Sequence, residues 1–179
     1  MARYPASCFL IALVLFFSTT AIVPAADYFP PADASVRVCF SPDGECMNLI
    51  LKEIAQAEKE ILIMAYAFGS LPMAKALVGA HQKGVKVELL LDKSERQEGY
   101  TPAALLSGSG IPVWFNGVHA VMNSRVVIID ERTVITGSHN FNTASETMNA
   151  ENLLIVKSGD LARKYRENWI KHRQHSENF

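Results

Sequence analysis

One uninterrupted apolar run, Ile61–Phe68, constrains the fold of this chain more than any other feature. A strand without polar alternation is covered on both faces, as in a sheet flanked by helices. Residues 85–91 predict a second buried strand. The segments before these strands repeat apolar residues at helical spacing, at Met47, Ile50, Leu51, Ile54 and Ala55 and again at Met73, Ala74, Leu77, Val78 and His81. Strands that alternate with helices predict an α/β fold.

The remaining segments extend the same pattern. Strands are predicted at 36–40, 111–115, 133–136 and 151–157, and a short helix opens at Thr101-Pro102. A last helix follows Ser158, with Leu161, Tyr165, Trp169 and His172 on one face. The 179 residues are 49% hydrophobic and 20% charged, which is typical of one globular domain. We therefore predict a single α/β domain over residues 36–179, with a mixed β-sheet flanked by helices.

The first 25 residues are predicted to be a secretory signal peptide. Arg3 is followed by the apolar run Cys8–Phe17 and by small residues at Val23-Pro-Ala25. The alternative is a retained anchor, but the apolar core is shorter than the ~20 residues that span a bilayer. Residues 26–35 contain two prolines and are predicted to be a linker. The expected location is secreted or periplasmic, with no stable membrane span after cleavage.

Charge and cysteine content agree with this location. Without Arg3 the chain has 17 − 1 = 16 basic and 18 acidic residues, so its composition gives no support to nucleic-acid binding through the whole surface. Loss of Cys8 leaves Cys39 and Cys46, which predict a disulfide in an oxidising compartment. A metal site, which needs further ligands nearby, or two free thiols are the alternatives.

Polar residues recur at fixed spacing around another apolar strand, Asn123-Ser-Arg-Val-Val-Ile-Ile-Asp130. Alternate residues of a strand share a face, so Asn123 and Arg125 are expected to point the same way. After a turn and a short strand, Gly137 delivers Ser138 and Asn140, two residues apart.

This segment resembles the signature of the phospholipase D superfamily, His-x-Lys-x4-Asp-x6-Gly-Ser-x-Asn. Asn123 stands at the family's histidine and Arg125 at its lysine, while the spacing is intact. The resemblance covers essentially the whole mature chain, including residues 38–44, 65–68 and 149–156. It is greatest to the small secreted bacterial nucleases and phosphodiesterases that carry one motif per chain, and it implies a phospholipase D-like sandwich.

The resemblance also implies a function. Such enzymes hydrolyse phosphodiesters through a covalent phosphohistidine, without metal or cofactor, and a one-motif chain forms a homodimer with a composite site. The implied partners are a second copy of the chain and a nucleic-acid or phospholipid substrate. Carried over by position, the implied catalytic set is Asn123, Arg125, Asp130, Ser138, Asn140 and Glu151. Arg125, Ser138 and Asn140 would bind substrate, Glu151 matches the acidic residue that orients the histidine, and Asp130 is expected to anchor the turn.

The amide at position 123 changes the expected chemistry. Imidazole is a nucleophile and proton carrier near neutral pH, whereas a carboxamide neither titrates nor transfers protons there. Arg125 retains a positive charge with a fork of donors. His119 is the candidate substitute, although an extended strand places it about 13 Å from Asn123. His139 is expected to point away from Ser138 and Asn140, and the remaining histidines, His81, His172 and His175, are expected on helices.

Two functions therefore compete. The first is a secreted phosphodiesterase or endonuclease of the phospholipase D type. The second is a catalytically inactive homologue that binds phosphate or nucleic acid in the retained pocket. The sequence does not choose among DNA, RNA and lipid, nor show whether Asn123 and Arg125 are natural or introduced.

Overall fold

The computed structural model describes residues 34–96 and 101–179. The predicted signal peptide and nearly all of the linker lie outside these ranges. Within them, no helix combines the length and the apolar character needed to cross a membrane.

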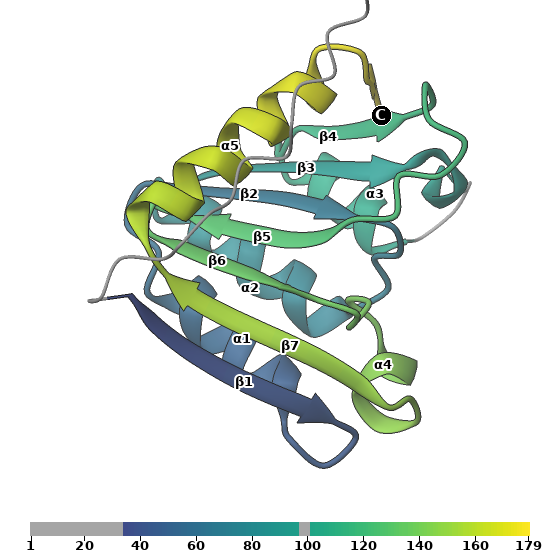
Figure 1. Cartoon of the computed structure of the whole chain (residues 1–179). Coiled ribbons are helices and arrows are strands. Elements are labelled where there is room, and N and C mark those ends of the chain that lie inside the picture. Colours follow the sequence, from purple (N-terminus) through teal and green to yellow (C-terminus); the bar gives the residue numbers. More distant parts are fainter. Residues whose placement is uncertain (1–33, 97–100) are drawn as a thin grey trace, which may run out of the picture.

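An eight-stranded mixed sheet forms the centre of the domain (Figure 1). Its order is β1-β7-β6-β5-β2-β3-β4-β8. Strands β2, β3 and β4 are parallel to one another, and every other neighbouring pair is antiparallel. The strand bounds are β1 Ser35–Ser41, β2 Glu60–Ala65, β3 Lys86–Asp92, β4 Val113–Asn116, β5 Arg125–Ile129, β6 Thr133–Gly137, β7 Glu151–Lys157 and β8 Glu177–Asn178. The predicted fold class is confirmed.

Helices cover both faces of this sheet. In Figure 1, α1 (Cys46–Ala55), α2 (Leu71–Gln82) and α3 (Pro102–Gly108) lie behind it, and α5 (Gly159–Arg173) crosses the front. Alternate residues of β2 enter two separate cores: Ile61 and Ile63 pack on the side of α1 to α3, while Leu62 and Met64 pack with Trp169 of α5. Because β2 faces an apolar core on each side, its apolar run has no polar alternation.

Helix caps follow the predicted chemistry. The hydroxyl of Thr101 accepts a hydrogen bond from the backbone N–H of Ala104 at 3.1 Å, and Pro102 occupies the first turn of α3. Ser158 caps α5 by accepting from Leu161 N at 3.4 Å. Each cap satisfies an amide that has no partner inside the helix.

Several predicted boundaries differ from the structure. The strand β2 begins at Glu60, one residue before the predicted apolar run. That strand ends at Ala65, and Phe68 instead forms a separate bridge to Phe141. Three elements of the described residues were not predicted: the 3₁₀ helix Lys93–Glu95, the short helix α4 (Thr143–Thr147) and the strand β8, which needs β4 as its partner.

The disulfide prediction is confirmed. Cys39 of β1 and Cys46 of α1 are bonded, with an S–S distance of 2.07 Å. Both cysteines are buried, so the bridge joins the edge strand to the first helix inside the core.

Candidate functional site

The predicted polar residues gather at one end of the sheet. Because β5, β6 and β7 are antiparallel neighbours, the start of β5, the end of β6 and the start of β7 lie at the same edge. Gly137 pairs with Leu153, and a Cβ atom at Gly137 would collide with the carbonyl oxygen of Asn152. Glycine therefore lets β6 approach β7 closely enough to bring Ser138 beside Glu151. We call this the polar edge, defined by Asn123, Arg125, Ser138, Asn140 and Glu151.

Arg125 is the cation of the polar edge. Its Nε donates to Asn140 Oδ1 at 2.7 Å, and its Nη1 donates to Asn123 Oδ1 at 2.7 Å. The guanidinium also lies over the ring of Tyr66, with 5.5 Å from Cζ to the ring centroid. These contacts confirm that Asn123 and Arg125 point the same way, although Asn123 precedes β5 and is exposed. Within the described residues, Nη2 has no hydrogen-bond partner and is available to an anion.

Ser138 and Glu151 form a tight pair beside this cation. Ser138 Oγ donates to Glu151 Oε2 at 2.5 Å and accepts from the backbone N–H of Asn152 at 3.1 Å. Asn149 Nδ2 donates to the other carboxylate oxygen at 3.0 Å. The hydrogen bond from Ser138 is the main cause of the lowered pKa of Glu151. Since a hydroxyl has one proton, Ser138 can donate to a phosphate only if it releases Glu151.

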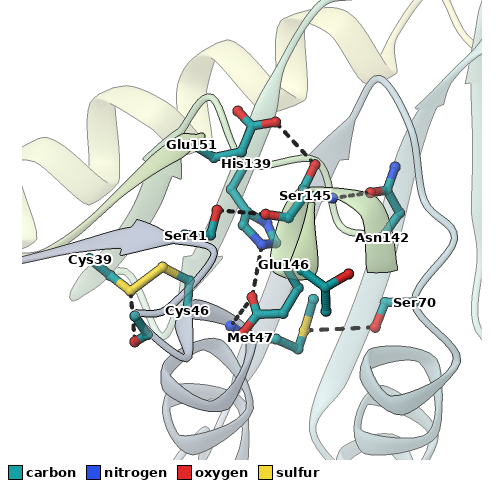
Figure 2. A network of polar contacts seen from close by, with 12 residues as sticks. Cys39, Ser41, Cys46, Met47, Ser70, His139, Asn142, Ser145, Glu146 and Glu151 are labelled. Carbon is teal, nitrogen blue, oxygen red and sulfur yellow. Dashed lines mark hydrogen bonds and ion pairs between the residues drawn. A yellow bond between two sulfur atoms is a disulfide. The ribbon is translucent and has the colours of Figure 1, made fainter. Parts of the chain in front are cut away.

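A hydrogen bond between the buried His139 and Glu146 supports this edge from below (Figure 2). His139 is fully buried, and its Nε2 lies 3.0 Å from Glu146 Oε2. The same oxygen accepts the backbone N–H of Met47 at the start of α1 at 2.9 Å. His139 thus points away from the neighbouring Ser138 and Asn140, as its alternate position predicted, and has a supporting place inside the domain.

Ser145, in the helix α4, hydrogen-bonds to two residues of the polar edge. Its hydroxyl donates to Glu151 Oε1 at 3.3 Å and accepts the backbone N–H of Asn140 at 3.1 Å. Figure 2 shows this residue between Glu151 and the amide of Asn142 that caps α4. Tyr66, Ser145, Glu146 and Asn149 were not among the predicted site residues. Ser145, Glu146 and Asn149 lie in the polar segment 141–150, and that polarity is the signal in the sequence that could have found them.

Asp130 lies at the other end of β5, away from the polar edge. Its carboxylate accepts three backbone N–H groups, from Glu58 at 2.9 Å, Lys59 at 2.8 Å and Glu60 at 2.9 Å. Burial acts to raise the pKa of Asp130, but these hydrogen bonds together lower it below its ordinary value. Asp130 has a φ of 55°, in the left-handed region that non-glycine residues rarely adopt. The carboxylate therefore holds a strained turn.

A cleft also lies at that far end. It has a volume of about 650 Å³, and its lining includes Asp130, Arg132 and Lys157. Lys157 is paired with Glu53 at 3.0 Å, which reduces its availability to an anion. The residues that line this cleft include none of the polar edge, so the cation and amides of the polar edge lie outside it.

His119 lies in the segment between β4 and β5. Its ring contacts His172 and His175, at centroid distances of 5.0 and 5.5 Å, and its Nδ1 lies 2.9 Å from Asn116 Oδ1. The structure thus shows His119 with partners other than Asn123. Burial lowers the pKa of His172, and the nearby charges of His119 and His175 lower it further. The prediction that His175 lies on a helix is wrong, because α5 ends at Arg173 and His175 follows it.

The comparisons with known proteins agree with the fold. Residues 50–173 match the family described as "Cardiolipin synthase, PLD-like domain". A phospholipase D of Rickettsia felis is 36% identical over 137 residues, which cover 76% of this chain and 68% of that protein. The phospholipase D family member Nuc from Salmonella typhimurium is 33% identical, with a TM-score of 0.76 over 82% of this chain and 99% of its own. NucT from Helicobacter pylori shares the fold at 20% identity, with a TM-score of 0.75 over 82% of this chain and 100% of its own.

Proposed function

Because the chain belongs to the phospholipase D-like family, we propose that its polar edge binds the phosphodiester group of a nucleic acid or a phospholipid without hydrolysing it by the family's route. One observation carries this proposal: Arg125 is held by Asn123 and Asn140, and an amide occupies the position of the attacking imidazole. The two histidines nearest in sequence have other partners, since His139 bonds to Glu146 and His119 contacts His172.

The charges of the edge favour an anion that makes several hydrogen bonds. Arg125 supplies a guanidinium whose Nη2 has no hydrogen-bond partner within the described residues. The Nδ2 of Asn140 also remains a donor, because Arg125 engages only the Oδ1 of that residue. The carboxylate of Glu151 is turned to Ser138 and Asn149. A phosphodiester, with one negative charge and two acceptor oxygens, suits this donor set better than a cation does.

The binding unit in this proposal is a homodimer. A single motif supplies half of a two-motif site, and a two-fold axis would place each Asn123 and Arg125 opposite their copies. Two exposed apolar side chains flank the polar edge in sequence, Val121 at 52% exposure and Met148 at 79%. A subunit interface at this edge would cover both side chains. Residues 1–25 support export of the chain, as a secreted or periplasmic protein.

Hydrolysis of the phosphodiester is the second candidate function. It is favoured by the intact set of Ser138, Asn140 and Glu151 and by the 36% identity to a protein named phospholipase D. It requires a nucleophile other than Asn123, because the amide nitrogen has no usable lone pair.

Binding and turnover separate the two candidates. We expect the wild-type protein to bind a short oligonucleotide or a vesicle with an anionic phosphodiester headgroup, measured by calorimetry. Arg125→Gln should weaken that binding about 10- to 100-fold, since hydrogen bonds to charged groups contribute roughly 1.5–3 kcal/mol. Arg37→Gln, an exposed arginine on the edge strand β1, is the matched control and should bind as the wild type does.

The same preparations are then assayed for hydrolysis of a generic bis-aryl phosphodiester in the presence of chelator. No rate above the buffer is expected. A rate that persists through purification and is abolished by Arg125→Gln would establish the second candidate instead. Unchanged binding in Arg125→Gln would refute the first.

A further inference from the structure

Three histidines meet at the end of the molecule where α5 finishes. His172 lies in the last turn of α5, His175 follows the helix, and His119 comes from the segment after β4. Their ring centroids are 5.0 to 5.5 Å apart. One ring nitrogen from each lies within 4.8 Å of the other two. This is the spacing at which three imidazoles can share one ion.

Two of these rings have buried nitrogens without hydrogen bonds. His172 Nδ1 and His175 Nε2 are inaccessible to solvent and have no partner within the described residues. A buried ring nitrogen that makes no hydrogen bond is costly. A metal ion would take the lone pair that each of these nitrogens offers when unprotonated.

The third ring is held in place by a fully buried amide. Asn116 Oδ1 lies 2.9 Å from His119 Nδ1, which assigns the proton to Nδ1 and leaves Nε2 as the free lone pair. Asn116 Nδ2 donates to Ser176 Oγ at 3.1 Å, and Ser176 Oγ donates to the backbone oxygen of His172 at 2.8 Å. One hydrogen-bond chain therefore fixes both sides of the cluster. A metal-ligating histidine is commonly oriented in this way through its second nitrogen.

The donor set selects the kind of ion. Three imidazoles with no carboxylate suit Zn²⁺ and similar borderline transition metals, whereas Mg²⁺ and Ca²⁺ require oxygen ligands. The charged groups near the cluster have other partners or lie beside it in sequence: Lys93 Nζ donates to the backbone oxygen of His119 at 3.2 Å, Glu177 pairs with Arg96 at 3.3 Å, and Lys171 and Arg173 flank His172 in the chain. The selection of the ion therefore rests on the three imidazoles.

We propose that His119, His172 and His175 bind one divalent transition-metal ion, Zn²⁺ first among them, with water as the fourth ligand. The ion joins the end of α5 to residues 117–124, the segment that contains Asn123 and leads into β5. That segment is already fixed further along, where the backbone N–H of Met122 donates to Asp92 Oδ2 at 2.7 Å. The metal site is thus a structural clamp beside the polar edge and takes no part in phosphoryl chemistry.

Metal binding is tested on the full mature chain, freed of any purification tag and stripped with chelator that is then removed. Equilibrium dialysis with elemental analysis should find one Zn²⁺ per chain and no retained Mg²⁺. At a free Zn²⁺ concentration of about 100 Kd, the melting temperature should rise by about 5–10 °C. Co²⁺ should give the visible absorption of a four-coordinate nitrogen site.

Variants locate the site. His172→Ala and His175→Gln should each abolish stoichiometric Zn²⁺ binding, the melting shift and the Co²⁺ absorption. His81→Ala is the matched control, because His81 is also half-buried with an unpartnered Nδ1 but lies on α2, across the sheet. It should bind Zn²⁺ as the wild type does. Absence of stoichiometric Zn²⁺ in the wild type, or full binding by folded His175→Gln, would overturn the proposal.

Discussion

The two ends of strand β5 carry residues of one sequence motif but differ in what those residues do. At one end, the carboxylate of Asp130 receives three backbone N–H groups and stabilises a left-handed turn. At the other, Arg125 donates to the side chains of Asn123 and Asn140 and to the backbone oxygen of Asn123, a residue exposed to solvent. The spacing between Arg125 and Asp130 is the length of the strand. One motif can therefore contain both residues that we propose to bind a ligand and a residue, Asp130, that only stabilises a turn.

The largest effect, a gain of hydrolysis, is expected from substitutions at the Arg125 end of β5. Asn123→His together with Arg125→Lys restores the family's pair, and imidazole then supplies a nucleophile and a proton carrier. We expect hydrolysis of a phosphodiester in chelator to rise by roughly 10²- to 10⁴-fold, the usual contribution of general acid–base help alone. Asn123→His alone should give part of this gain, because Arg125 already supplies charge. A double variant that folds and dimerises yet stays inert would show that the polar edge differs from its active relatives at further positions.

A smaller effect is expected at the Asp130 end, and on stability instead of chemistry. Asp130→Asn should lower the free energy of unfolding by about 1–3 kcal/mol, because an amide cannot accept three backbone N–H groups as a carboxylate does. Urea unfolding measures this loss. Asp43→Asn, at an exposed aspartate in the β1–α1 turn, is the control. Phosphodiester binding by Asp130→Asn should equal that of the wild type, and a loss there would contradict the assignment of Asp130 to the frame.

The pH dependence sharpens the same prediction. The folded pKa of Asp130 lies below its unfolded value of about 3.9. Its stabilisation is therefore complete above that value and is lost as the pH falls through the folded pKa. The difference between wild type and Asp130→Asn should be largest above pH ~4 and should shrink in more acidic solution.

The smallest effect is expected for Glu151, in the polar edge itself. Its pKa is also lowered, first by the hydrogen bond from Ser138, so its contribution likewise disappears as the pH falls through the folded pKa. Glu151→Gln should reduce stability by about 0.5–1.5 kcal/mol, because a neutral oxygen still accepts from Ser138. Glu167→Gln on the exposed side of α5 is the control. A loss larger than that of Asp130→Asn would reverse the ranking of the two ends.

Local patterns predicted the elements of this fold because each depends on neighbouring residues. The apolar run of β2, the caps at Thr101 and Ser158 and the alternation of Asn123 with Arg125 need only periodicity and short-range chemistry. Residues that meet across the chain were not accessible in that way. Tyr66 reaches Arg125 only because β2 pairs with β5.

The same limit applies to the histidines and to α4. Isolated histidines read as surface residues until the fold brings His119 to the end of α5. The helix α4 is only five residues long, too short for a periodic signal, and is fixed by the cap at Asn142 and by the reach of Glu146 to Met47.

The pairing of β1 with β7 has a consequence for how the chain folds. Val38 lies opposite Leu154, so the first strand made has as its only neighbour in the sheet the last long strand. Closing so long a loop costs chain entropy before any contact repays it, and such pairings slow folding. During synthesis the backbone N–H and C=O groups of β1 have to wait for residues 151–157 to emerge, while Val36, Val38 and Phe40 on its outward face stay exposed even in the finished domain. Until then the strand is an open template for other chains, and the nascent protein should depend on holding chaperones more than its final stability suggests.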